Sequence, residues 1–242
     1  MTTVLRASGI VRRYGPRAVV DGVDLDLCTG EIVVLLGENG AGKTTLMRTL
    51  AGELGLDGGS VEVLGIDLGR EPERARRGLI YVSQRPALAP LASLRDHAEA
   101  LAAFRGLATA AWPAEMVALA SALRLGDVLD VPVRALSGGM QHKCALVLGL
   151  LANTPLAMFD EPHTGLDVRS ALALRELIRG RRASGTAFLL ASHLAEATLA
   201  LADRALVLRG GRVGCAFGVT ELAAFRGDAR AFEQAVLDAM GA

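Results

Sequence analysis

A glycine-rich segment that directly follows a short apolar run constrains the fold of this chain more than any other feature. Residues 37–45 read Gly-Glu-Asn-Gly-Ala-Gly-Lys-Thr-Thr and come after the run Glu31-Ile-Val-Val-Leu-Leu36. An apolar strand that passes through a G-x-x-x-x-G-K-T turn into a helix is the phosphate-binding P-loop arrangement. Glycines allow a tight turn whose N–H groups form a nest for phosphate oxygens, and the helix that follows adds its positive dipole end. The segment therefore predicts an α/β fold with a nucleoside triphosphate site.

Individual positions in this loop have separate predicted roles. Lys43 is expected to reach the β- and γ-phosphates, and the Thr44 hydroxyl is expected to ligate Mg²⁺. The other predicted phosphate-binding positions of the loop are Gly37, Asn39, Gly40, Ala41, Gly42 and Thr45.

Composition narrows the class of protein. The chain has 242 residues and a formal net charge of +0, so no broad attraction to nucleic acid is expected. Its longest apolar stretch, residues 144–152, is too short to cross a bilayer, and the first residues lack the pattern of a secretion signal. Cys28, Cys144 and Cys215 have no metal-ligand spacing and are expected to be reduced. A cytoplasmic protein is the resulting prediction.

Three regions of different character follow one another along the chain. Up to about residue 66, short strand-like runs alternate with glycine turns and are interrupted by one helix, predicted over 43–51. Residues 90–151 are rich in Ala and Leu and predict helices, with breaks at Trp112-Pro113 and Val131-Pro132. Strands and helices then alternate, which predicts a parallel sheet with crossover helices. The organisation expected is one nucleotide-binding core with a helical insertion.

The insertion ends in a second phosphate-binding pattern, Leu136-Ser-Gly-Gly-Met140, followed by Gln141. Ser137, Gly138 and Gly139 are predicted to lie at a helix N-terminus, which favours anions. In a P-loop protein this string resembles the signature motif of ATP-binding cassette (ABC) proteins, although the family usually has Gln where Met140 stands. The resemblance implies that ATP is the nucleotide, and that the signature of one domain closes over the γ-phosphate held by the P-loop of another. A homodimer and a heterodimer of ATPase domains both remain open.

The resemblance also implies a division of the chain. The expected fold is an α/β P-loop NTPase core with a parallel sheet, an antiparallel β subdomain and an α-helical insertion subdomain. One ABC ATPase domain would cover 1–242. Its RecA-like core and β subdomain would take 1–86 and 152–242, and its helical subdomain 87–151.

Two carboxylates and a histidine end predicted strands of the third region. The apolar run 156–159 leads into Asp160 and Glu161, and the run 186–192 leads into His193. Ligands bind at the carboxyl edge of parallel sheets. Asp160 is therefore predicted to hold Mg²⁺, and Glu161 to act as general base toward the attacking water. His193 resembles the family's switch histidine, which contacts the γ-phosphate and orients Glu161.

Three further residues match the family's order of motifs. Tyr14 resembles the aromatic residue on which adenine stacks. Gln84, after the run 79–83, resembles the glutamine that reaches Mg²⁺ and water and links nucleotide state to the insertion. Asp167, in Gly165-Leu-Asp, resembles the segment that lies across the dimer interface. His163 stands where the family usually has a small residue, and no role is predicted for it.

The function implied is that of an ATP-hydrolysing subunit of a transporter. Its partner would be a separate transmembrane permease subunit, and the chain would lie peripherally on the cytoplasmic face of the cell membrane. The stretch 86–107 resembles the insertion of export ATPases for drugs, peptides or polysaccharides, so export is expected. Docking is expected between the Gln84 loop and residues 88–104. The alternative is a soluble ABC ATPase that is not coupled to transport, such as a cluster-assembly ATPase.

Overall fold

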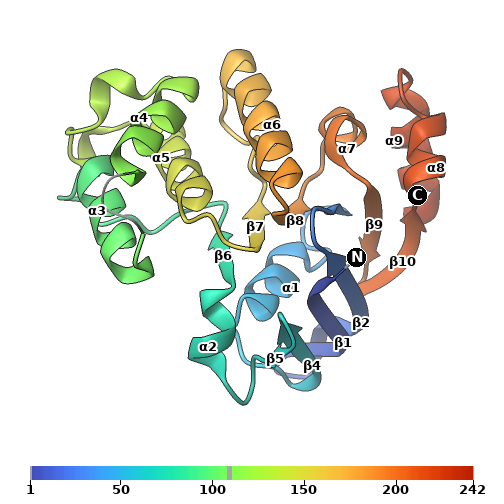
Figure 1. The fold of residues 1–242 in the computed structure, drawn as a ribbon. Coiled ribbons are helices and arrows are strands. Elements are labelled where there is room, and N and C mark those ends of the chain that lie inside the picture. Colours follow the sequence, from blue (N-terminus) through green and yellow to red (C-terminus); the bar gives the residue numbers. More distant parts are fainter. Residues whose placement is uncertain (1, 108–110, 242) are drawn as a thin grey trace.

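Two β-sheets organise the protein, for which a computed structural model describes residues 2–107 and 111–241 (Figure 1). Residues 1, 108–110 and 242 of the predicted domain ranges lie outside the described part. The first sheet is antiparallel and has the order β2-β1-β4-β5. Its strands are β1 (Thr3–Tyr14), β2 (Arg17–Cys28), β4 (Gly58–Val63) and β5 (Ile66–Asp67).

The second sheet has the order β10-β9-β3-β8-β7-β6. All its neighbouring pairs are parallel except the hairpin of β9 and β10. Its strands are β3 (Ile32–Leu36), β6 (Leu79–Val82), β7 (Leu156–Asp160), β8 (Ala187–Ala191), β9 (Arg204–Arg209) and β10 (Arg212–Phe217). The predicted fold class, an α/β protein with a parallel sheet, an antiparallel sheet and a helical insertion, is confirmed.

Helices cover both faces of the second sheet. The first part of the chain has α1 (Lys43–Leu50) and α2 (Pro72–Arg77). The segment within 87–151 has α3 (Leu94–Arg105), α4 (Trp112–Ala122), α5 (Gly138–Leu151) and the 3-10 turns η1 (Gly126–Val128) and η2 (Val133–Ala135). The last part has α6 (Val168–Ala183), α7 (Ala195–Leu201), α8 (Val219–Ala224) and α9 (Ala229–Met240). In Figure 1, α3, α4 and α5 form a lobe beside α6, on the side of the sheet where β6 is the edge strand.

The central strands are apolar because both of their faces are buried. Every residue of β3, β7 and β8 is buried. Side chains alternate between faces along a strand. Ile32, Val34 and Leu36 accordingly pack with the helical lobe, α6 and α9. Val33 and Leu35 pack with α1 and the antiparallel sheet. The sheet is thus fixed from both sides, and its carboxyl edge is held in one place.

Close packing also ties α5 to this sheet. A Cβ on Gly149 would lie 2.5 Å from Val82 Cγ2 and 3.0 Å from the Phe159 ring. The helix that begins at the signature pattern therefore lies directly against the strands that end near Gln84 and Asp160.

The structure differs from the predicted elements in two places. Trp112 and Pro113 were expected to lie at a break between helical segments; α3 does end before them, at Arg105, but the two residues belong to the first turn of α4. Proline fits there because the first N–H groups of a helix have no intrahelical partner. Helices α2, α8 and α9 were not predicted, and α8 and α9 bury Leu222, Phe232 and Val236. Within the described part of the chain, none of the helices combines the length and the apolar character needed to cross a membrane.

Candidate functional site

The P-loop connects β3 to α1 and leaves the start of α1 open to a ligand. Gly42 occupies the N-cap position with φ of 104°, and no side chain caps the helix there. A Cβ on Gly42 would lie 2.6 Å from Val19 O, so only glycine fits both the backbone angle and the space. The first N–H groups of a helix lack intrahelical partners. Those of α1 therefore face the loop as donors for an anion.

Lys43 lies inside this loop and is 7% exposed. Its Nζ donates to Gly37 O at 2.6 Å and to Glu38 O at 3.2 Å, and it lies 3.9 Å from Glu161 Oε1. A buried ammonium needs compensating partners. The loop carbonyls and Glu161 supply them, and they hold the charge at the place where phosphate is predicted to bind.

Thr44 and Asp160 come together across the carboxyl edge of the sheet. Thr44 Oγ1 donates to Asp160 Oδ2 at 2.7 Å, and Asp160 is 1% exposed. Its other oxygen, Oδ1, is buried and has no hydrogen-bond partner among the described residues. A buried carboxylate oxygen without a partner is costly, and oxygen ligands are those that Mg²⁺ prefers. Thr44 and Asp160 therefore fit the predicted Mg²⁺.

Glu161 follows Asp160 in a strained backbone conformation. Its φ is 52°, a left-handed value that non-glycine residues seldom adopt, and its N–H donates to Ala191 O at 3.0 Å. The carboxylate contacts His193, whose Nδ1 lies 2.8 Å from Glu161 Oε2. Glu161 is buried, whereas the His193 side chain is 55% exposed. A carboxylate oriented by a histidine at the mouth of a cavity is placed to accept a proton from water.

Lys43, Thr44, Asp160 and Glu161 surround one pocket of about 310 Å³, whereas His193 lines a separate pocket beside α9. Nine predicted site residues line it: Asn39, Gly40, Gly42, Lys43, Thr44, Thr45, Gln84, Asp160 and Glu161. Val19 and Glu38 also line it and were not predicted. The Val19 contribution arises from tertiary contact with Gly42, so no local pattern could have indicated it. Gly37 and Ala41 belong to the same loop but contribute no wall to this pocket.

The predicted signature residues lie elsewhere, at the start of α5. Ser137 is the N-cap, and its hydroxyl accepts from Met140 N at 3.3 Å. Ser137 and Gly138 are exposed, and Gly139 is half-buried because it approaches Gly165 O. Ser137, Gly138 and Gly139 do not line the P-loop pocket. The two predicted phosphate sites are therefore not brought together in one copy.

Asp167 links this region to α6. It caps α6 by accepting from Ser170 N at 3.0 Å, and it pairs with Lys143 of α5 at 2.7 Å. Hydrogen bonds from Lys143 and Ser170 hold the pKa of Asp167 well below its usual range. Asp167 thus fixes the segment that follows Glu161 against the signature helix, and half of its side chain stays exposed.

Tyr14 lies at the end of β1 and is 49% exposed. The Arg12 guanidinium lies 5.4 Å from its ring centroid. Its ring does not line the P-loop pocket, so its role toward adenine stays a prediction.

Two histidines, the buried His142 of α5 and the half-buried His163, lie where the signature helix meets the segment after Glu161. His142 Nε2 contacts Pro162 O at 3.3 Å. Burial lowers the pKa of His142, and burial with the nearby charge of Arg175 lowers the pKa of His163 to about 4. Both histidines are therefore neutral at pH 7.

The fold and the pocket together define a P-loop nucleotide-binding domain with a helical subdomain. A family model described as "ABC transporter" matches residues 20–164, more than half of the chain. The chain belongs to this family, and the predicted family is confirmed.

Named relatives agree with this membership. The Nod factor export ATP-binding protein I of Ralstonia nicotianae is 35% identical over 211 residues, which cover 87% of this chain and 66% of that protein. The lipopolysaccharide export system ATP-binding protein LptB of Acidithiobacillus ferridurans is 34% identical over 88% of this chain and 89% of that protein. The sn-glycerol-3-phosphate import ATP-binding protein UgpC 1 of Rhizobium johnstonii is also 34% identical, over 85% of this chain and 56% of that protein. The chain thus spans just under two thirds of the length of the Nod factor relative.

A solved structure of an ATP-binding subunit of an ABC transporter superposes with a TM-score of 0.90 at 27% identity, and covers 99% of this chain and 100% of that one. Nothing among these relatives supports the alternative of an ATPase that is not coupled to transport.

Proposed function

We propose that this chain is the ATP-hydrolysing subunit of an ABC transporter. The observation that carries the proposal is the convergence of Lys43, Thr44, Asp160 and Glu161 on one pocket at the carboxyl edge of the sheet. The loop N–H groups and Lys43 bind the phosphates, and Thr44, Asp160 and Gln84 hold Mg²⁺, which neutralises charge on the phosphates. Glu161, oriented by His193, accepts a proton from the attacking water.

A second ATPase domain completes the site in this proposal. Of the signature residues, Ser137 and Gly138 are exposed and Gly139 is half-buried, and none of the three lines the P-loop pocket. A helix start of this kind stabilises negative charge. Each signature would therefore cover the γ-phosphate bound by the other domain, and Asp167 would lie at their interface. Phosphoryl transfer depends on positioning and charge neutralisation, so assembly of the pair controls the rate.

A transmembrane permease subunit is the proposed second partner, with the chain on the cytoplasmic face of the membrane. A groove of about 690 Å³ lies between α1, β6, α5 and the segment 83–88, and Gln84 lines both this groove and the P-loop pocket. Residues of the predicted docking stretch beyond Leu88 do not line this groove. Leu91 and Phe104 are instead 70% and 86% exposed on the adjacent lobe. Export is the proposed direction. It is supported by the resemblance of the stretch 86–107 to the insertion of export ATPases and by the names of the export relatives.

Hydrolysis is tested by measuring phosphate release from Mg-ATP over a range of protein concentrations. If two domains share each site, turnover per chain rises with concentration until the pair is saturated. A rate per chain that is constant from dilute to concentrated protein would contradict the shared site, and absence of any ATP binding would contradict the whole proposal.

The membrane partner is tested by a tagged pull-down from detergent-solubilised membranes of the native cell, with mass spectrometry of the bound proteins. Recovery of a polytopic membrane protein supports the transporter subunit. Recovery of soluble partners alone, with the chain absent from membranes, would overturn it.

A further inference from the structure

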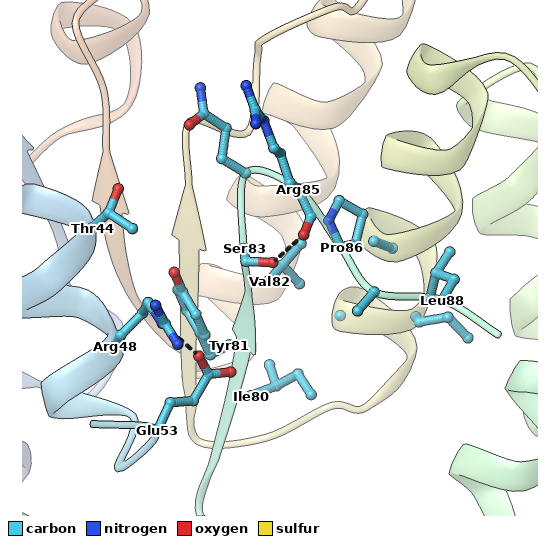
Figure 2. A pocket seen from close by; sticks show the side chains of 15 residues that line it. Thr44, Arg48, Glu53, Ile80, Tyr81, Val82, Ser83, Arg85, Pro86 and Leu88 are labelled. Atoms are coloured by element: carbon cyan, nitrogen blue, oxygen red, sulfur yellow. Dashed lines mark hydrogen bonds and ion pairs between the residues drawn. The ribbon is translucent and has the colours of Figure 1, made fainter. Parts of the chain in front are cut away.

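Tyr81 lies between the P-loop pocket and the groove of about 690 Å³ described above, which we call the docking groove. It belongs to β6 and lines the groove together with Arg48 and Glu53, which form an ion pair of 3.0 Å. Figure 2 shows its side chain between the α1 side chains Thr44 and Arg48 on one side and the segment that begins at Ser83 on the other. At Tyr81 the groove is therefore adjacent to the start of α1, where the P-loop ends.

The Tyr81 hydroxyl extends from the groove to the predicted magnesium ligand. Its oxygen lies 3.4 Å from Asp160 Oδ2, the same oxygen that accepts from Thr44 Oγ1 at 2.7 Å. Both hydroxyls are donors to a carboxylate, and the phenol of tyrosine stays protonated at neutral pH. With Oδ2 engaged in this way, the other oxygen, Oδ1, is left without a partner within the described residues. Two hydroxyls on one oxygen thus orient the carboxylate so that the other oxygen is available.

Backbone pairing and packing fix the position of this hydroxyl. Tyr81 pairs with Met158 in the parallel register of β6 and β7, two residues before Asp160 on the neighbouring strand. Its side chain packs against the buried apolar cluster that includes Leu46 and Leu50 of α1. A side chain anchored in this way aims its polar end at a defined place, as groups that support metal ligands do.

We propose that Tyr81 is a positioning residue for the magnesium site. This inference rests on the proposed function, because it requires that Asp160 hold Mg²⁺. Thr44 and Gln84 provide further connections between the groove and the pocket, because both residues line the two cavities.

The test is Tyr81→Phe, which removes one oxygen and keeps the ring that packs on α1. The matched control is Ser83→Ala, because Ser83 lines the same groove but donates to Arg85 O at 3.1 Å rather than to Asp160. ADP binding is measured by calorimetry in EDTA and over a range of free Mg²⁺ concentrations. Supporting groups around metal ligands commonly change metal affinity by about 10–100-fold, and a long hydrogen bond is weaker than the norm. We therefore expect the Mg²⁺ concentration for half-saturation to rise about threefold to tenfold in Tyr81→Phe.

The possible outcomes distinguish a positioning role of Tyr81 from a loss of folding stability and from failure of the proposed function. Support consists of a raised Mg²⁺ requirement with unchanged ADP affinity in EDTA, unchanged Tm, and a Ser83→Ala variant like the wild type. An unaltered Mg²⁺ requirement in Tyr81→Phe would overturn the role of Tyr81 alone. ADP affinity of the wild type that does not depend on Mg²⁺ would instead remove the magnesium site on which the inference rests.

Discussion

Two helix starts in this chain are predicted to face phosphate, and they are built differently. The start of α1 lies in a pocket with the buried side chains of Lys43 and Asp160, which are 7% and 1% exposed. The start of α5 is on the surface, where Ser137 caps its own helix and Gly138 is exposed. The first is surrounded by charged groups of the same chain, and the second offers mainly its backbone and dipole.

We call the start of α1 with the P-loop pocket the α1 region, and the start of α5 with Ser137 and Gly138 the α5 region. Their difference predicts that nucleotide binding and hydrolysis depend on different parts of the chain. A pocket with a buried ammonium and two carboxylates has the partners that a magnesium nucleotide needs, so one copy is expected to bind nucleotide alone. An exposed helix start contributes only modest stabilisation to an anion. It becomes effective when a second domain brings a bound phosphate to it and excludes water. Binding should therefore depend on the α1 region and turnover on both regions.

Lys43→Ala should have the largest effect, because it removes the cation that the loop carbonyls hold beside Glu161. Hydrogen bonds to charged groups contribute about 1.5–3 kcal/mol, so nucleotide affinity should fall about tenfold or more. Hydrolysis should fall with it. Calorimetry with ADP and a phosphate-release assay measure the two effects. Wild-type affinity and rate in this variant would show that the α1 region does not bind the nucleotide.

Glu161→Gln should separate the two functions within the α1 region itself. A general base contributes about 10²–10⁴-fold to a rate, so hydrolysis should drop by at least about 100-fold. Nucleotide affinity should be retained, and ATP should hold two copies together because closure is no longer followed by hydrolysis. Size-exclusion chromatography with ATP detects the pair. A variant that hydrolyses ATP at the wild-type rate would exclude Glu161 as the base.

Gly138→Asp tests the α5 region alone. A Cβ at this position would meet nothing within 4 Å, so the folded chain accepts the change. A carboxylate at the helix start repels an incoming phosphate, and we expect turnover to fall at least about tenfold, since opposed like charges at an interface cost several kcal/mol. ADP affinity should stay at the wild-type value. Gly138→Ala is the matched control, and it should keep most of the turnover. Loss of ADP binding in Gly138→Asp would mean that the two regions are not separate.

The sequence predicted the α1 region in more detail than the contacts between regions. The glycines, Lys43 and Thr44 are adjacent in sequence, so local conformation brings them together. The pairing of Thr44 with Asp160 was predictable as a shared edge of the sheet, because parallel strands end at the same side. Val19, however, reaches the P-loop from the antiparallel sheet. No spacing in the sequence indicates such a contact.

The helices that were not predicted show the same limit. α2 has six residues and begins at Pro72, and α8 is equally short. Isolated helices of that length are not stable in water, so tertiary packing forms them. The boundary between α3 and α4 lies near Trp112 and Pro113 as predicted, but the two residues start α4 because proline fits the first turn of a helix. What the sequence could not supply was the neighbour on which each segment packs.

The two regions meet within one chain at His142 and His163. His142 belongs to the signature helix and contacts Pro162 O, which follows Glu161, and the two histidines are close enough to interact electrostatically. Arg175 of α6 lies near His163 as well. His142, His163 and Arg175 thus lie together at a partly buried boundary, and added positive charge there is unfavourable, so the boundary is most stable while both histidines are neutral.

The smallest expected effect is a pH-dependent loss of folding stability at this boundary. The loss is absent at neutral pH, where both histidines are neutral. The pKa of His163 is lowered from 6.5 to about 4 in the folded chain. Between those values the unfolded chain binds a proton that the folded chain does not, so stability falls as the pH drops from about 6.5 to about 4, by up to about 3 kcal/mol. His163→Gln removes this proton-linked loss. Its Tm should therefore decline less than that of the wild type between pH 7 and pH 5, while any change in packing affects both pH values alike. If the Tm of both proteins falls equally between pH 7 and pH 5, protonation of His163 does not destabilise this boundary, and other groups cause the loss of stability at low pH.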